Sequence, residues 1–197
     1  GGLAGRRNNA WEIEDGCSDV ELVDCVVEDA GGTGFGVRNH GWPHAVATRR
    51  ISFTRCKTKN VRSGWVVRGT DHQVTVSGVK LIKCQTDATS STFVQAVDGV
   101  EITGSSFTGL LLLGMRGTQA AELEIAARPA RDVIISNTSI GRFKANLKPG
   151  NNGKIDYQPT ARLINVKAES AQVFGNLKSL KINGCQFKTP LKHGGQP

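Results

Sequence analysis

Asp71 and His72 form the pair of neighbouring side chains in this sequence that is best suited to acid-base chemistry. A carboxylate beside a histidine orients the imidazole and raises its basicity. Such a pair suits proton abstraction or the activation of water, so we expect Asp71 and His72 to be catalytic. A glycosidase would need a second carboxylate, and a shift of one repeat places Asp98 near Asp71.

Five further residues around this pair are suited to substrate binding. Arg38 and Arg68 each end a short apolar segment, and two guanidinium groups can bind a carboxylate bidentately. His40, Trp42 and His44 follow Arg38, and the Trp42 indole is suited to stacking on a sugar ring. We therefore expect all five residues to contact a substrate.

Plain turn structure is the alternative explanation for the same residues. Asn, Asp, His and Gly are common at corners because they tolerate turn geometry, and Trp-Pro also occurs as a packed turn. Glu14 and Arg38 then form one more ion pair between neighbouring repeats. Gly and Pro separate His40 from His44, which excludes a helical pair of metal ligands, and no third ligand is evident. We expect no metal and no cofactor.

An internal repeat must position these side chains. Its copies share aliphatic or aromatic residues at the first and third positions and a small Cys, Ser or Thr at the sixth, as in a strand with one buried face. The copies occupy residues 20–25, 51–56, 79–84, 100–105, 133–138 and 180–185, with a weaker copy at 161–166. Unequal spacing is typical of a solenoid whose extra residues form loops. Leucine-rich and helical repeats do not fit, which favours a parallel β-helix.

A second short strand accompanies several copies and carries an aromatic residue. We align Trp11, Phe35, Trp65 and Phe93 at one equivalent position, which predicts an aromatic ladder in the core. Residues 119–128 are the one segment that suggests a helical period, and a short helix there is left open.

Composition excludes several protein classes. The 24 glycines show no Gly-X-Y period, which excludes collagen, and the longest purely aliphatic run, residues 110–113, is far too short to span a membrane. Five cysteines is an odd number, so at least one thiol is free or bonded to another chain. No Cys-x-x-Cys pair occurs, and we expect the cysteines to be structural.

Charge is distributed in blocks along the chain, whose net charge is +8. Residues 11–29 carry eight acids and no base, whereas residues 49–68 carry seven bases and no acid. Stacking the repeats aligns the pairs Asp24–Arg55, Glu28–Lys59, Arg55–Lys83 and Lys59–Asp87, of which only the third is repulsive. We prefer this pairing to a nucleic-acid patch. From residue 99 onward there are 13 bases against 6 acids, an excess suited to an anionic polymer or to solubility.

The repeated units, such as Val-Lys-Leu-Ile-Lys-Cys (79–84) and Val-Glu-Ile-Thr-Gly-Ser-Ser-Phe (100–107), resemble the pectate-lyase-like superfamily over about residues 11–188. The resemblance implies an all-β fold, a right-handed parallel β-helix of about seven turns. We expect a single domain over residues 1–197, a fragment of a longer chain, with loop insertions at 118–131 and 144–160.

Members of this superfamily include polysaccharide lyases, glycoside hydrolases, uronan epimerases and bacteriophage tailspikes. The resemblance implies a polysaccharide partner, with anionic polymers included, and leaves lyase, hydrolase, epimerase and simple binding open. It also implies an extracellular or virion location, although the given chain has no signal peptide, and a homo-oligomer that is a trimer if tailspike-like. The rival is a non-catalytic structural or adhesive module of a virion or cell-surface assembly. We expect no membrane span and no nucleic-acid partner.

Overall fold

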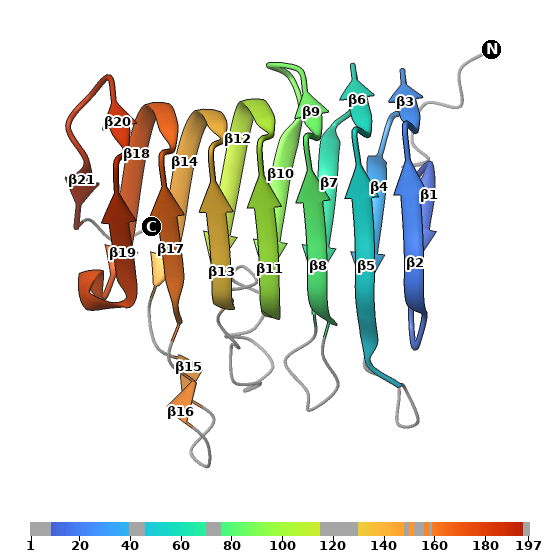
Figure 1. Cartoon of the computed structure of the whole chain (residues 1–197), viewed down its shortest axis with the longest axis horizontal. Coiled ribbons are helices and arrows are strands. Elements are labelled where there is room, and N and C mark those ends of the chain that lie inside the picture. Colours follow the sequence, from blue (N-terminus) through green and yellow to red (C-terminus); the bar gives the residue numbers. More distant parts are fainter. Residues whose placement is uncertain are drawn as a thin grey trace.

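The chain alternates between two parallel β-sheets, which lie one behind the other in Figure 1. The computed structural model describes residues 9–39, 46–69, 76–114, 130–147, 150–151, 156–157 and 159–194. Within them a 12-stranded sheet, here sheet A, faces a 7-stranded sheet, here sheet B. Sheet A contains β1 (Trp11–Ile13), β3 (Val26–Glu28), β4 (Thr33–Arg38), β6 (Lys57–Lys59), β7 (Ser63–Arg68), β9 (Gln85–Thr86), β10 (Ser91–Gln95), β12 (Ser106–Gly114), β14 (Ser139–Leu147), β18 (Lys167–Gly175), β20 (Gln186–Phe187) and β21 (Lys192–His193).

Sheet B is built from the repeat copies seen in the sequence. It contains β2 (Ser18–Val23), β5 (Thr48–Thr54), β8 (Val76–Ile82), β11 (Val97–Thr103), β13 (Arg131–Ser136), β17 (Ala161–Ile164) and β19 (Leu180–Asn183). Neighbouring strands pair in the predicted register, which places Val20 opposite Ile51 and Ile51 opposite Val79. The weaker copy at 161–166 also forms a strand of sheet B, β17, because Ala161 pairs with both Val133 and Leu180. The predicted repeat is therefore confirmed.

The remaining elements are short. β15 (Gly150–Asn151) and β16 (Asp156–Tyr157) pair antiparallel, and η1 (Leu177–Ser179) is a single turn of 3-10 helix. β14 continues to Leu147, so the first four residues of the expected insertion 144–160 extend a strand instead. The other expected insertion, 118–131, lies mostly outside the described residues. The segment 119–128, considered as a helix, lies entirely outside them. The fold is all-β, with parallel strands in curled sheets, and is compatible with a β-helix or another solenoid.

A residue in the left-handed region of φ follows each strand of sheet B. These residues occupy equivalent places and have φ between 49° and 62°: Asp24, Arg55, Lys83, Gly104, Asn137, Asn165 and Gly184. Asp, Asn and Gly tolerate this conformation better than other residues do. The turn that follows carries the chain from sheet B into sheet A, which explains why these residue types recur at the sequence spacing of the repeat.

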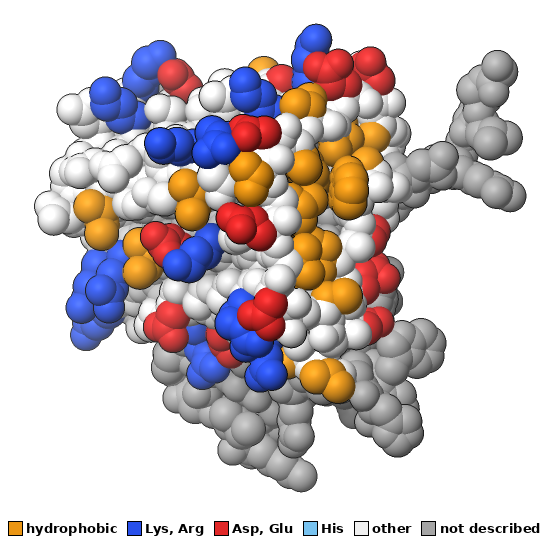
Figure 2. All heavy atoms as spheres, turned by 45° about the vertical axis from the view of Figure 1, so that its right-hand side comes forward, with side chains coloured by type: hydrophobic (Ala, Val, Ile, Leu, Met, Phe, Trp, Pro, Cys, Tyr) orange, Lys and Arg blue, Asp and Glu red, His pale blue; other side chains and the backbone are white. Residues whose placement is uncertain are grey.

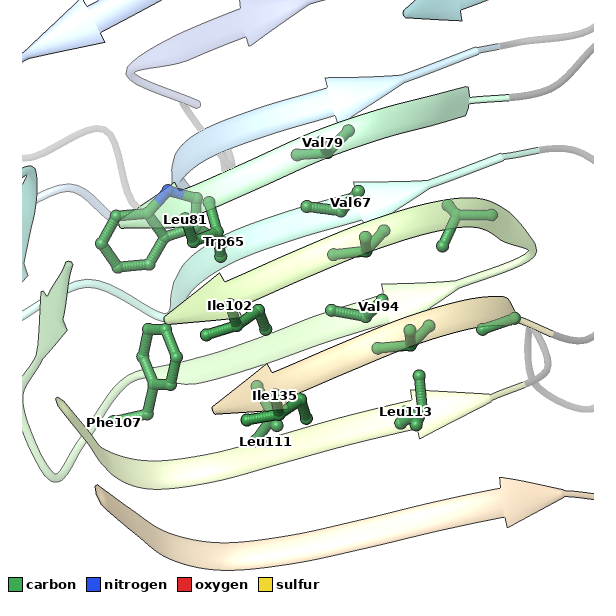
Figure 3. Close-up of a cluster of buried hydrophobic side chains, with 14 of the residues drawn as sticks. Trp65, Val67, Val79, Leu81, Val94, Ile102, Phe107, Leu111, Leu113 and Ile135 are labelled. Atoms are coloured by element: carbon green, nitrogen blue, oxygen red, sulfur yellow. The ribbon is translucent and has the colours of Figure 1, made fainter. Parts of the chain in front are cut away.

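The core lies between the two sheets and consists of inward-facing side chains from both (Figure 3). The Phe35 and Trp65 rings stack with centroids 5.3 Å apart, and Trp65 meets Phe107 edge-on at 5.8 Å. Phe53 of sheet B contacts Phe35 at 5.3 Å. Aromatic pairs in these geometries add about 0.5–1.5 kcal/mol to the free energy gained by burying their area.

The predicted aromatic ladder is correct in part. Trp11, Phe35 and Trp65 are paired in register on β1, β4 and β7, although Trp11 is 51% exposed on the edge strand. The assignment of Phe93 is wrong: it pairs with Val66, and Thr92 takes the buried place instead. The register between β7 and β10 shifts by one residue, because Ser63 to Val66 spans three steps and Ser91 to Phe93 spans two. Within β10, Phe93 stands between the buried Thr92 and Val94, so the alternation of that strand places it on the outward face of sheet A.

The cysteines are free thiols, and two of them belong to the core. Cys56 and Cys84 are fully buried at the corner between the sheets, and each thiol lies within hydrogen-bonding distance of a backbone carbonyl. Burial raises the pKa of Cys84 to about 12, so its thiol stays protonated at neutral pH. These two cysteines are structural, as predicted.

Candidate anion-binding site

Arg38 and Arg68, the two arginines predicted to bind substrate, lie side by side on the outward face of sheet A. They are register partners at the ends of β4 and β7. The inward positions before them are filled by Val37 and Val67, so the alternation of the strands sends both guanidinium groups outward. The other predicted site residues, Asp71, His72, His40, Trp42 and His44, lie outside the described residues.

Neighbouring polar groups hold both guanidinium groups in place. Arg68 donates from Nε and Nη2 to the Oε1 atom of Gln95, at 3.1 and 2.9 Å, and Gln95 is almost fully buried. The Gln95 amide is neutral, so this contact orients the Arg68 guanidinium without cancelling its charge. Arg38 donates to the Thr33 hydroxyl at 3.0 Å and lies 3.4 Å from the Glu12 carboxylate.

Arg38 thus contacts Glu12, two residues before the Glu14 that the sequence alignment paired with it. The Glu12 side chain lies across β4 at Gly36, where a Cβ atom would collide with the carboxylate. Glycine at this position leaves room for the acid to reach Arg38. The ion pair is only about one-fifth to one-quarter exposed, which strengthens it relative to a surface pair.

A hollow of about 320 Å³ lies between these arginines and a third arginine, Arg62. Its wall includes the side chains of Val66 and Phe93, and Asn9, Gly32, Thr33 and Ser63 complete the lining. Three guanidinium groups around an apolar wall suit a ligand that combines anionic groups with a hydrophobic ring face. Phe93 contributes to this wall because the alternation of β10 turns its side chain outward.

The apolar wall continues along sheet A toward the C-terminal half. Phe93 pairs with Leu112, and both side chains are half-buried on the outward face. Leu112 pairs with Lys144, and Leu110 beside it pairs with Arg142. Strands lie about 4.8 Å apart, so β14 runs about 14 Å from β7, and Lys144 and Arg142 lie two and four residues before the row of Arg68 along the strand. The outward face of sheet A thus carries two basic regions with an apolar strip between them.

Arg50 and Arg55, in and directly after β5 of sheet B, have a different setting, because each binds an aspartate one strand away. Arg50 binds Asp19 with two contacts of 2.5 and 2.6 Å, and Arg55 binds Asp24 at 2.7 and 2.6 Å. The hydrogen bond from Arg50 lowers the pKa of Asp19 to about 2. The predicted Asp24–Arg55 pair is confirmed.

Two other carboxylates considered from the sequence are also engaged. Asp98, the potential partner of Asp71 in a glycosidase, binds Arg131 at 2.8 and 2.9 Å. Glu28 lies 3.9 Å from Lys59, as predicted. Asp87 accepts hydrogen bonds from the Asn60 backbone and from Ser90 instead of serving mainly as a partner for a lysine.

A larger hollow of about 600 Å³ lies at the bend of β12, β14 and β18. Lys167 and Lys188 contribute the cationic groups, but Lys188 binds Glu169 at 2.7 Å. We prefer the smaller hollow as the functional site, because its three guanidinium groups are planar bidentate donors, whereas the lysines of the larger one are point charges.

Within the described residues, no group of three His, Cys, Asp or Glu side chains is placed to hold a metal ion. In the same part of the chain, no helix is long and apolar enough to cross a membrane.

Comparisons with known proteins gave no relative. The chain matches no protein family, and neither the curated proteins nor the solved structures gave a match. The function must therefore be argued from the site itself.

Arg62, Val66 and Gln95 are among the contributors to the site that were missed from the sequence. Arg62 precedes β7 and reads as one more base of a charged block, and Val66 reads as a core residue. The position of Gln95 could have been predicted from the sequence, because Gln95 in β10 is the register partner of Arg68 in β7.

Proposed function

We propose that the protein is a right-handed parallel β-helix of about seven turns that binds an acidic polysaccharide on the outward face of sheet A. Support for the fold comes from the chain's regular alternation between two parallel sheets. Parallel strands joined by a crossover are right-handed in about 98% of cases, which favours this handedness.

One observation carries the proposed function: three arginines surround a hollow with an outward phenylalanine in its wall. Uronic acids and sulfated sugars present a planar or tetrahedral anion next to a ring with apolar C–H faces. Arginine binds the anion bidentately, and an aromatic ring packs against the sugar. A hollow of about 320 Å³ is near the lower limit for small-molecule sites, which suits a short stretch of a longer chain.

Sheet A also offers a path for the rest of such a polymer. The apolar strip of Phe93, Leu110 and Leu112 leads from the hollow toward Arg142 and Lys144. A polyuronate carries a carboxylate on every sugar, so successive charges would meet the first and second basic regions in turn. This arrangement favours an extended anionic chain over a single small anion.

Catalysis is proposed at the residues that follow β7. Asp71 and His72 come three and four positions after Arg68 in the sequence. A guanidinium bound to a sugar carboxylate acidifies the adjacent C–H, and His72, oriented by Asp71, would accept that proton in a lyase reaction. The electron pair of the C–H bond then forms a C=C bond as the glycosidic C–O bond breaks, and the departing sugar oxygen takes up a proton from the protonated His72 or from water. His40, Trp42 and His44, which follow β4, would extend the binding surface. An extracellular or virion location is proposed on the same grounds, since such polymers occur there.

Binding is tested by affinity electrophoresis or calorimetry with polygalacturonate and alginate, with dextran as the neutral polymer and single-stranded DNA as a different polyanion. We expect the acidic polysaccharides to bind, and Arg68→Ala to weaken binding about ten- to a hundredfold. Arg162→Ala, which removes an exposed arginine from sheet B, is the matched control. Tighter binding to DNA, or equal effects of the two variants, would contradict the proposal.

Turnover is tested by reducing-end release together with ultraviolet absorbance of unsaturated products. Both signals identify a lyase, and reducing ends alone identify a hydrolase. Asp71→Asn and His72→Ala should abolish either signal and leave polysaccharide binding and the melting temperature unchanged. Binding without turnover on every polymer would remove the catalytic part of the proposal, and absence of binding would favour the structural or adhesive module.

A further inference from the structure

The two ends of the strand stack carry edge strands that match one another. At the N-terminal end the edge consists of β1, β2 and β3, and at the C-terminal end it consists of β21, β19 and β20. Within the described residues each of these strands pairs with one neighbouring strand only. β20 and β21 both pair with β18. Unpaired strand edges present rows of N–H and C=O groups that can pair with another chain.

Strand register defines columns that run through the whole stack from one end to the other. Following the paired residues from strand to strand, Lys181 lies in the column of Glu21, Lys188 in that of Glu28, and Lys192 in that of Glu12. The apolar columns also continue, since Ile182 lies in the column of Leu22 and Phe187 in that of Val27. Three lysines at one end thus match three glutamates at the other.

The two ends of the strand stack also carry opposite charge: the N-terminal end is acidic and the C-terminal end is basic. Residues 11–29 contain eight acids and no base, whereas residues 177–194 contain four lysines, one histidine and no acid. Contact between two N-terminal ends would bring acids together, and contact between two C-terminal ends would bring lysines together. Only an N-terminal end against a C-terminal end joins opposite charges and keeps all strands parallel.

Both ends also expose apolar side chains. Val23 and Val26, on outward-facing columns, are 43% and 55% exposed at the N-terminal end, and Ile182, in a core column, is 42% exposed at the other. Figure 2 shows hydrophobic side chains gathered in a column on the N-terminal side of the molecule, with acidic side chains near it. Stacking would cover these side chains with the same kinds of residue that cover their equivalents inside the molecule.

We propose that copies of this chain associate head to tail, with β19, β20 and β21 of one copy pairing with β2, β3 and β1 of the next. Such a contact joins two different surfaces and so does not close on itself after two copies, which predicts open linear oligomers. Glu21–Lys181 and Glu28–Lys188 form the intermolecular ion pairs, and the two cores become continuous.

The cysteines supply a direct test, because Cys25 and Cys185 lie in one column and are both partly exposed. Parallel neighbours lie about 4.8 Å apart, within the Cα separation of a disulfide, so stacking brings Cys185 of one copy next to Cys25 of another. Diamide takes up the two electrons and two protons that the thiols lose as the S–S bond forms. A Cys56→Ser background removes the competing bond within one copy, and Ser105 shows that the column accepts serine.

We expect diamide treatment to give a ladder of disulfide-linked oligomers on non-reducing gels, and peptide mapping to find the Cys25–Cys185 link. Cys25→Ser or Cys185→Ser should abolish the ladder, whereas Cys17→Ser, at an exposed thiol outside this column, should leave it unchanged. A Cys25–Cys25 link would show a symmetric contact and overturn the proposal. Absence of any link, with a monomer at all concentrations by ultracentrifugation, would also overturn it.

Charge exchange tests the same interface without oxidation. Glu21→Lys or Lys181→Glu alone should raise the apparent dissociation constant of the oligomer roughly two- to thirtyfold, because an attraction becomes a repulsion. The double variant Glu21→Lys/Lys181→Glu places opposite charges together again and should restore association. Failure of the double variant to recover, with all three variants folded by circular dichroism, would contradict the register proposed here.

Discussion

Arginines on the outward faces of the two sheets differ in what lies one strand away. On sheet B, Arg50 and Arg55 each bind an aspartate of the neighbouring strand through two contacts of 2.5–2.7 Å. On sheet A, Arg38 and Arg68 are each other's register neighbours, and the next residue along that row is the neutral Gln95.

The comparison shows how one residue type serves two purposes on a repeated scaffold. An arginine stacked on an aspartate has its charge balanced within the fold, and an exposed pair of this kind adds little stability. On sheet A, Arg38 also has a carboxylate partner, Glu12 on the neighbouring strand, whereas the neutral Gln95 amide orients Arg68, which suits Arg68 to the anion of a ligand. The neighbour in the column, more than the arginine itself, distinguishes a structural pair from a binding site.

The largest expected effect concerns two aromatic residues on neighbouring strands, one inward and one outward. Trp65→Ala should lower the free energy of unfolding by about 3–5 kcal/mol, because its side chain is fully buried against Phe35 and Phe107. Phe93→Ala should cost about 1 kcal/mol or less, since Phe93 faces outward, but should weaken polysaccharide binding several-fold. Urea unfolding and calorimetry measure the two effects. Equal losses of stability would place Phe93 in the core and remove it from the site.

An intermediate effect separates the two kinds of arginine. Arg68→Ala should reduce affinity for acidic polysaccharide about ten- to a hundredfold, because it removes a bidentate charge-assisted contact. Arg55→Ala makes the same change of charge on sheet B and should alter affinity less than twofold. Arg68→Lys keeps the charge but loses the fork geometry, and should recover only part of the affinity. Full recovery would mean that net charge alone drives binding.

The smallest effect is the pH dependence of the sheet B pairs. The Arg50 guanidinium lowers the pKa of Asp19 from about 3.8 to about 2, and Arg55 lowers the pKa of Asp24. Carboxylates with lowered pKa stabilise the fold above their unfolded pKa and lose that contribution as pH falls through the folded value. Stability should therefore stay level from neutral pH to about 4 and decline between about 4 and 2. An NMR titration of Asp19 with a midpoint near 3.8 would show that the pair does not form.

Repetition made most of the fold predictable from the sequence. The hydrophobic pattern at 20–25 and its later copies identified every strand of sheet B within the described residues, because each copy must bury the same face. The error at Phe93 has a local cause. A bulge changes the register by one residue, and matching aromatic to aromatic overrode the simple alternation that points Phe93 outward.

The candidate site was predictable only where it followed the repeat. Arg38 and Arg68 came from equivalent ends of two strands, so their proximity followed from stacking. Glu12 was missed in favour of Glu14, because the long side chain of Glu12 crosses Gly36 to reach Arg38. Contacts made by a side chain across a strand depend on its reach, which a column alignment does not describe.

The central claim is that the stacked arginines of sheet A bind the anionic groups of a polysaccharide. The most direct test is calorimetric titration of polygalacturonate, alginate and hyaluronate, each with its carboxyl-reduced counterpart, into the wild-type protein and the double variant Arg38→Ala/Arg68→Ala. We predict that at least one acidic polymer binds, that its carboxyl-reduced form does not, and that the double variant loses binding while keeping its fold. Equal binding of the acidic and reduced polymers, or unchanged binding by the folded double variant, would contradict the claim.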